Sequence, residues 1–366
     1  MKVHLHGWFG FRNLGDDLLL QRAVTVLNGI DAVDAIEIGA EDCDYLESFL
    51  RSKKALKFSG RNFAELFKAA FRNDALVIGP GGLFPHRNFP KVAAYLVLTV
   101  WWKLLGKQVA YFGLGATSKQ DLASVFCWKR IAVISDAFIC RDTDLLNACD
   151  IKQNEFVLAG SDLVFLGKPD SVSGDGNRIA VAFANLFAED ESGYDHFARD
   201  CTEIISAFVK EGYGVDLLSF TSGSDERLNR QIATELYDSS VHPLSYDETL
   251  KSVLEGLGRY RLMLGMRFHS VLLASREGIP FVAISYAHKT ERLASNLGMR
   301  KNCVKYCKDE HGYYEQLIPL DTKSVIDLCF DALRNPGNAT ADVDAVGALR
   351  RGAERSATLL KETLSS

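Results

Sequence analysis

The chain has 366 residues, of which 47% are hydrophobic and 24% are charged. This length exceeds one ordinary hydrophobic core and predicts two domains of a globular protein. The formal net charge of -5 argues against a dedicated nucleic-acid-binding protein, which would concentrate lysine and arginine on one surface.

The cysteines and the apolar runs indicate which metal sites, compartment and membrane spans to expect. Of eight cysteines, only Cys303 and Cys307 are close in sequence, and no second pair completes a zinc site. We therefore expect no metal, and a cytoplasmic protein, because the N-terminus shows no apolar signal region. The longest apolar run, residues 92–102, is too short to cross a bilayer. It predicts a core helix, with peripheral contact to the inner membrane face as the alternative.

Short β-rich runs alternate with helical patterns through the first half of the chain. The expected strands are residues 2–6, 75–78, 108–112, 137–140 and 155–158. This alternation predicts parallel strands joined by crossover helices.

A segment rich in Gly, Ser, Asp and Pro at residues 167–176 predicts a linker, after which a second alternating series begins. Its expected strands are residues 178–183, 215–219, 260–264 and 281–285. Its expected helices are residues 193–211, 225–236, 247–256 and 269–277. The sequence therefore predicts an α/β fold of two Rossmann-like parallel-sheet domains that face a cleft. We expect an N-terminal domain at 1–170, a C-terminal domain at 171–340, and a helix at 341–366 that packs back across both.

The loop at residues 7–17 follows the first strand directly and precedes a helical pattern. Its glycine spacing is not the dinucleotide fingerprint, and Asp16 and Asp17 would repel a pyrophosphate. One interpretation is a helix start capped by Asp16. The other places Arg12 and Asn13 in the cleft, with a carboxylate that binds substrate hydroxyls or acts as a base.

Two more glycine-rich turns follow predicted strands, at residues 79–84 and 113–116. Repeated turns of this kind at one sheet edge indicate that a ligand approaches the main chain there. We expect Gly81, Gly82 and the nearby His86 to contact an acceptor. Arg141, which follows another strand, adds a cation to the same edge, unless Asp142 is only a helix cap beside a surface arginine.

The second half carries a cluster of cationic and polar residues at the ends of two predicted strands. Gly265, Arg267 and His269 follow the strand at 260–264, and Ser285, Tyr286 and Lys289 follow the next one. The carboxyl ends of parallel strands are where open α/β sheets bind ligands. These residues therefore predict an anion site, although Arg267 as a solvated cap and His269 as a packed side chain are the simpler interpretation.

Together these motifs resemble the polysaccharide pyruvyltransferases, in the same order and over nearly the whole chain. The motifs are the loop at 7–17, Gly-Pro-Gly-Gly-Leu-Phe at 79–84, Gly-Leu-Gly at 113–115, Arg141-Asp142, Ser-Asp-Leu-Val at 161–164, Gly-Met-Arg-Phe-His-Ser at 265–270, and Ser285-Tyr286 with Lys289. The resemblance implies a fold like the two-Rossmann GT-B glycosyltransferases. It also implies transfer of pyruvate from phosphoenolpyruvate to two hydroxyls of a sugar, with release of phosphate.

The chemistry of phosphoenolpyruvate suits these residues. Its enol carbon must be protonated before an alcohol adds, and His269 is the candidate general acid. Arg267, Arg141 and Lys289 would bind the carboxylate and the phosphate. Asp16, Asp17 and His288 are candidate bases, and we assign Asp16 together with His269 to catalysis. The remaining first-loop residues, Arg12, Asn13 and Asp17, would contact the acceptor, and no further cofactor is expected.

Two other functions fit the same sequence. A GT-B glycosyltransferase would use these cations to bind the diphosphate of a nucleotide sugar, and it would release a nucleoside diphosphate. A non-catalytic anion-binding component of polysaccharide assembly would bind phosphoenolpyruvate without turnover. The acceptor sugar itself, and whether its carrier is a lipid or an oligosaccharide, are not encoded in these motifs.

Overall fold

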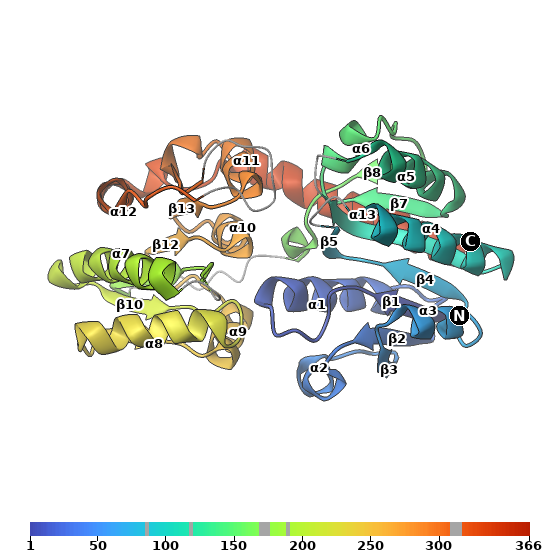
Figure 1. The fold of residues 1–366 in the computed structure, drawn as a ribbon, viewed down its shortest axis with the longest axis horizontal. Helices are drawn as coiled ribbons and strands as arrows, with labels where there is room; N and C mark the ends of the chain where they lie inside the picture. Colours follow the sequence, from blue (N-terminus) through green and yellow to red (C-terminus); the bar gives the residue numbers. More distant parts are fainter. Residues whose placement is uncertain (85–87, 117–119, 168–175, 188–190, 308–316) are drawn as a thin grey trace. The chain divides into compact units, whose positions relative to one another are not determined.

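The computed structural model describes residues 1–84, 88–116, 120–167, 176–187, 191–307 and 317–366. The chain forms two compact units, each with a parallel sheet (Figure 1). The first unit comprises Met1–Leu166 together with Ala348–Ser366, and the second comprises Gly167–Gly347. The predicted α/β class with two parallel sheets is confirmed. Most of the proposed linker, residues 168–175, lies outside the described residues.

The sheet of the first unit has the order β3-β2-β1-β4-β6-β7-β8, and β5 pairs with β6. Its strands are β1 (Lys2–His6), β2 (Ala35–Ala40), β3 (Ala55–Gly60), β4 (Ala75–Ile78), β5 (Gly81–Phe84), β6 (Gln108–Ala116), β7 (Ala137–Cys140) and β8 (Val157–Ala159). The helices between them are α1 (Leu14–Asn28), α2 (Cys43–Phe49), α3 (Phe63–Ala69), α4 (Phe89–Leu104), α5 (Leu122–Ile134), α6 (Asp144–Ala148) and η1 (Leu163–Phe165). The central strand β4 is apolar and buried at every position, as expected when helices cover both faces of a parallel sheet.

The sheet of the second unit has the order β11-β10-β9-β12-β13-β14. Its strands are β9 (Arg178–Ala182), β10 (Gly214–Leu217), β11 (Val241–Pro243), β12 (Leu262–Gly265), β13 (Phe281–Ser285) and β14 (Cys303–Lys305). Its helices are α7 (Glu191–Lys210), α8 (Ser224–Leu236), α9 (Tyr246–Glu255), α10 (Phe268–Glu277), α11 (His288–Asn296), η2 (Arg300–Asn302), α12 (Thr322–Arg334) and η3 (Pro336–Asn338). The strand order reverses between β9 and β12, which is the position where such sheets bind ligands.

Five strands were missed by the sequence prediction, namely β2, β3, β5, β11 and β14. Two of them, β11 and β14, have only three residues each, and β3 is an edge strand with exposed positions. The strand β5 was expected as a glycine turn, but Gly81 and Phe84 pair with Leu114 and Ala116 of β6. In the short strands β11 and β14 the pairing partner, rather than a local apolar pattern, fixes the structure.

The C-terminal helix α13 (Val343–Ser365) packs closely on the first unit from Ala348 onward. A Cβ atom built at Gly352 would lie 2.3 Å from the Ser161 hydroxyl, and one at Gly160 would lie 1.8 Å from that of Ser356. Glycine at both positions therefore lets the helix backbone approach the loop after β8. Within the described part of the chain, no helix combines the length and the apolar character needed to traverse a bilayer.

Strand β1 places two histidines, His4 and His6, on one buried face. The Nε2 atom of His6 lies 2.8 Å from the Tyr95 hydroxyl. Burial, together with the charges of His4, Arg61 and Lys91, lowers the pKa of His6 to about 3. The imidazole of His6 is therefore neutral near pH 7.

This buried imidazole should make the first unit sensitive to acid. Because its folded pKa lies below the unfolded value of 6.5, the unfolded chain takes up an extra proton as the pH falls. Relative to His6→Gln, the wild type should lose about 2 kcal/mol of unfolding free energy between pH 7 and pH 5. Urea unfolding followed by tryptophan fluorescence measures this, since all four tryptophans lie in the first unit. A difference that does not change with pH would contradict the prediction.

Candidate functional site

The candidate donor residues of the second unit lie where β12 and β13 end. These strands are paired, with Gly265 opposite Ala283, so that Arg267 and Tyr286 follow neighbouring strand ends. Tyr286 is close enough to the Arg267 guanidinium to raise its pKa. The structure thus brings together two of the predicted donor-binding residues.

The guanidinium of Arg267 is held by a carboxylate that the sequence analysis did not identify. Its Nε donates to Asp225 Oδ2 at 3.0 Å, and its Nη2 donates to Asp225 Oδ1. Burial opposes the charge of Arg267, but Asp225 and Tyr286 more than compensate, so that the pKa of Arg267 is raised. The side chain of Arg267 is only 19% exposed and that of Asp225 is completely buried. We expected the Nε and Nη2 groups of Arg267 to bind the donor, but they bind Asp225 instead.

Asp225 also accepts hydrogen bonds from the main chain of two other loops. The N–H of Asn185, after β9, donates to Oδ1 at 3.2 Å. The N–H groups of Phe220 and Thr221, after β10, donate to Oδ2 at 3.2 and 3.0 Å. One carboxylate therefore fixes three strand-end loops. The signal in the sequence was an acidic residue in the first turn of a helix that follows a strand.

His269 and Lys289 both neighbour the same aromatic ring. The ring of Phe268 meets the imidazole of His269 edge-on, with centroids 5.4 Å apart. The Nζ atom of Lys289 lies 5.3 Å from the centroid of that ring. His269 is in the first turn of α10, and it is partly exposed. The predicted acid and a predicted anion-binding cation thus share one neighbourhood.

Two other predicted donor-binding residues are buried. Ser285 is 1% exposed, and its hydroxyl donates to the Ala287 carbonyl at 2.9 Å. A Cβ atom at Gly265 would lie 2.6 Å from the Ser270 hydroxyl, so this glycine permits a close helix–strand contact. The burial of both residues argues against direct contact with the donor and for positioning of the loops that carry Arg267 and Tyr286.

Arg141 belongs to the first unit, after β7. Its Nε lies 3.6 Å from Asp142 Oδ2, and its Nη1 lies 3.6 Å from Asp162 Oδ2. A Cβ atom at Gly115 would lie 2.8 Å from its Nη2, so the guanidinium lies against the backbone of β6. Both acidic neighbours belong to the motifs at 141–142 and 161–164, which therefore meet in space.

The first loop separates its two aspartates. A Cβ atom at Gly81, whose φ is +118°, would lie 3.2 Å from Asp16 Oδ1, so Asp16 lies beside the first residue of β5. Asp17 is completely buried, and its Oδ2 accepts a hydrogen bond from the Tyr45 hydroxyl at 2.7 Å. This burial argues against the predicted contact of Asp17 with an acceptor.

The other first-loop residues have structural partners too. The side chain of Asn13 caps α1 by accepting from the Gly15 N–H. Arg12 lies over the Tyr45 ring, 4.4 Å from its centroid, and is partly exposed. The predicted acceptor residue His86 lies outside the described residues. Within the described ranges, no group of three or more His, Cys, Asp or Glu side chains is placed to hold a metal ion.

Comparison with solved structures defines the class of fold. The S. aureus MnaA–UDP structure matches with a TM-score of 0.58 at 9% identity, over 99% of this chain and 96% of that one. The UDP-GlcNAc 2-epimerase of Neisseria meningitidis matches with 0.58 at 11%, over 100% and 99%. The E. coli ADP-heptose LPS heptosyltransferase II matches with 0.50 at 14%, over 92% and 100%. The chain thus has the two-Rossmann fold of GT-B glycosyltransferases and the related epimerases.

Comparison of sequences identifies the family. Residues 13–288, about three quarters of the chain, match the polysaccharide pyruvyl transferase family model. The chain belongs to this family and is a transferase. It is also similar to the amylovoran biosynthesis protein AmsJ of Erwinia amylovora, with 25% identity over 312 residues, which cover 82% of this chain and 67% of the relative.

The ion pair between Asp225 and Arg267 should dominate the stability of this site. Asp225→Asn leaves a mostly buried guanidinium without its countercharge, and we expect the free energy of unfolding to fall by about 3 kcal/mol. The control Asp327→Asn removes the carboxylate of an exposed ion pair with Lys323, and it should cost less than about 1 kcal/mol. Urea unfolding followed by circular dichroism compares the two variants. An equal loss of unfolding free energy in both variants would show that Asp225 does not stabilise the strand ends of the second unit.

Proposed function

We propose that the protein transfers the pyruvyl group of phosphoenolpyruvate to two hydroxyls of one sugar in a bacterial surface polysaccharide or its precursor. The products are a cyclic ketal and inorganic phosphate. One observation carries this proposal: a member of the polysaccharide pyruvyl transferase family has His269 and Lys289 around one ring, beside the anchored cation Arg267.

The first step is addition of an alcohol to the enol phosphate of phosphoenolpyruvate. His269 donates a proton to the terminal CH₂ carbon, which makes C2 cationic and open to attack by a sugar hydroxyl. A C–O bond forms at C2, and the hydroxyl proton passes to a base. Then the C2–O bond to phosphate breaks, and phosphate leaves with the proton taken from the first hydroxyl. A second hydroxyl of the same sugar attacks C2 and closes the ketal ring, and its proton restores the acid form of His269. No oxidant, reductant or further cofactor is consumed.

The carboxylate and the phosphate of the donor require cations. Lys289 would supply an ammonium over the ring of Phe268. Arg141 stays a predicted donor-binding guanidinium. Since the Nε and Nη2 edge of Arg267 binds Asp225, the donor would meet the opposite edge of that guanidinium. Arg267 would then act as a fixed positive charge, without a bidentate pair of N–H groups for the donor.

Asp16 is our candidate for the base that accepts the hydroxyl proton. Unlike Asp17 it is partly exposed, and it neighbours Gly81, which is followed by the exposed Gly82. The AmsJ protein takes part in amylovoran biosynthesis. This likeness supports an acceptor that belongs to an exopolysaccharide, either on a lipid carrier or as an oligosaccharide.

The acid role of His269 is tested by its removal. His269→Ala should lower the rate of phosphate release from phosphoenolpyruvate by at least about 100-fold, because a positioned general acid contributes that much. The control His196→Ala changes an exposed histidine on α7 and should leave the rate unchanged. Phosphate is measured with a panel of sugars, and mass spectrometry detects the pyruvylated product.

The same assay separates this function from its rivals. Release of a nucleoside diphosphate from a sugar nucleotide, without use of phosphoenolpyruvate, would identify a glycosyltransferase. Turnover of His269→Ala at the wild-type rate would remove the acid role of this histidine.

A further inference from the structure

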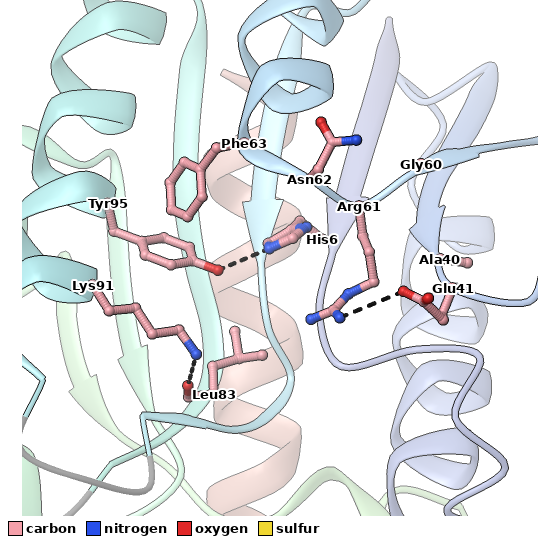
Figure 2. A pocket seen from close by; sticks show the side chains of 10 residues that line it. All are labelled: His6, Ala40, Glu41, Gly60, Arg61, Asn62, Phe63, Leu83, Lys91 and Tyr95. Carbon is pink, nitrogen blue, oxygen red and sulfur yellow. Dashed lines mark hydrogen bonds and ion pairs between the residues drawn. The ribbon is translucent and has the colours of Figure 1, made fainter.

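The first unit contains a pocket that none of the predicted site residues lines. It lies at the carboxyl ends of β1, β2 and β3, which contribute His6, Ala40 and Gly60, and α3 and α4 supply the other wall (Figure 2). Its volume is about 430 Å³, within the range of ordinary small-molecule sites. The position is the sheet edge at which open parallel α/β sheets bind ligands.

Two cations line this pocket, and each is partly withdrawn from water. Arg61 follows β3 and is 21% exposed, and Lys91 is in the first turn of α4. Burial lowers the pKa of Arg61, and it lowers the pKa of Lys91, with the charge of Arg61 acting in the same direction. Figure 2 shows both side chains reaching into the pocket from opposite walls. The charged groups of Arg61 and Lys91 thus lose part of their hydration, and this loss is unfavourable.

The protein itself compensates these charges poorly. The nearest carboxylate to Arg61 is that of Glu41, whose Oε2 lies 3.8 Å from Nη1 and whose side chain is 59% exposed. The Nε of Arg61 is buried and has no hydrogen-bond partner among the described residues. Lys91 donates to the Leu83 carbonyl at 2.6 Å, and no carboxylate of the described chain forms an ion pair with it. A buried donor without a partner indicates a place for a ligand atom.

The guanidinium of Arg61 is nevertheless fixed in position. Its central carbon lies 4.3 Å from the ring centroid of Trp8 and 4.7 Å from that of Phe11. These two rings stack on each other with centroids 4.3 Å apart. Both belong to the loop at 7–17, so that one role of this motif is to hold Arg61 by cation–π contact.

Apart from the carboxylate of Glu41, which also lines the pocket, the remaining walls are neutral and partly aromatic. Tyr95 binds His6 through its hydroxyl, and Phe63 meets the Tyr95 ring edge-on at 5.2 Å. His6 carries no charge near pH 7, so it neither repels a cation nor neutralises an anion. The pocket therefore offers two cations beside aromatic and apolar surface, which suits an acidic group attached to a sugar ring.

We propose that this pocket is a subsite for an acidic group of the acceptor, a carboxylate or a phosphate held between Arg61 and Lys91. This inference rests on the proposed function, and it names the acceptor as acidic. The acidic group has two chemical sources: a uronic acid in the saccharide, or the phosphate that links a sugar to its carrier. Both would accept hydrogen bonds from the Nε of Arg61 and from the ammonium of Lys91.

Binding of defined probes tests the subsite without any turnover. The probes are glucuronate, glucose 1-phosphate and the neutral control glucose, titrated by calorimetry into the full chain. We expect one or both acidic probes to bind the wild type at least about ten-fold more tightly than glucose, as charge-assisted hydrogen bonds require. The acid that binds more tightly identifies the uronic acid or the phosphate as the source.

Two variants remove the charges while keeping an unbranched, flexible side chain at each position. Arg61→Gln and Lys91→Met should each weaken binding of the acidic probe by about ten-fold and leave glucose binding unchanged. The matched controls Arg51→Gln and Lys53→Met change exposed cations of the same unit and should have no effect. Tryptophan fluorescence in urea verifies that each variant folds like the wild type.

Three results would overturn the subsite. They are equal affinity of the wild type for all three probes, unchanged acid binding in both pocket variants, and weaker binding of phosphoenolpyruvate in those variants, which would make the pocket a donor site. Because the probes are titrated without phosphoenolpyruvate, failure here is distinct from failure of pyruvyl transfer. The latter appears only in the phosphate-release assay.

Discussion

The carboxylate of Asp225 is the interaction on which the edge of the second unit depends. It receives the guanidinium that follows β12 and three main-chain N–H groups from the loops after β9 and β10. Through Arg267 it also reaches Tyr286 after β13. A buried charge with this many donors is tolerated because each of them offsets part of its lost hydration. The ends of four neighbouring strands are thereby held in one arrangement before any substrate arrives, which is the condition for electrostatic preorganisation.

The first unit holds an arginine by different means. Arg61 has only a distant carboxylate, and stacked Trp8 and Phe11 hold it instead. The two units thus represent two ways of placing a guanidinium. An ion pair consumes the hydrogen-bonding edge of the arginine, whereas an aromatic contact leaves that edge available to a ligand. This difference separates an arginine that organises its loops from one that is ready to bind.

The sequence predicted features that depend on neighbouring residues, and it missed features that depend on residues far apart in the chain. The strand at 281–285 and the helix ending at Glu277 were predicted well, because continuous apolar runs and helical spacing are local signals. The pairing of Asp225 with Arg267 joins residues 42 positions apart, and no local pattern encodes it. Arg61 was missed because β3 is an edge strand, although the alternation of Leu56 and Phe58 before Gly60 was a usable signal. Burial of Asp17 by Tyr45 was likewise invisible, since adjacent acidic residues look alike until packing separates them.

The return of α13 to the first unit has a consequence for biogenesis. A ribosome delivers the strands of the first sheet early, but the helix that covers the loop after β8 emerges only after the entire second unit has been synthesised. Until then the nascent first unit exposes the surface at Gly160 and Ser161 that α13 later covers, and exposed surface of this kind favours premature association. Nonsense mutations anywhere in the second half, or bulky fusions to the last turn, would consequently impair both units rather than one.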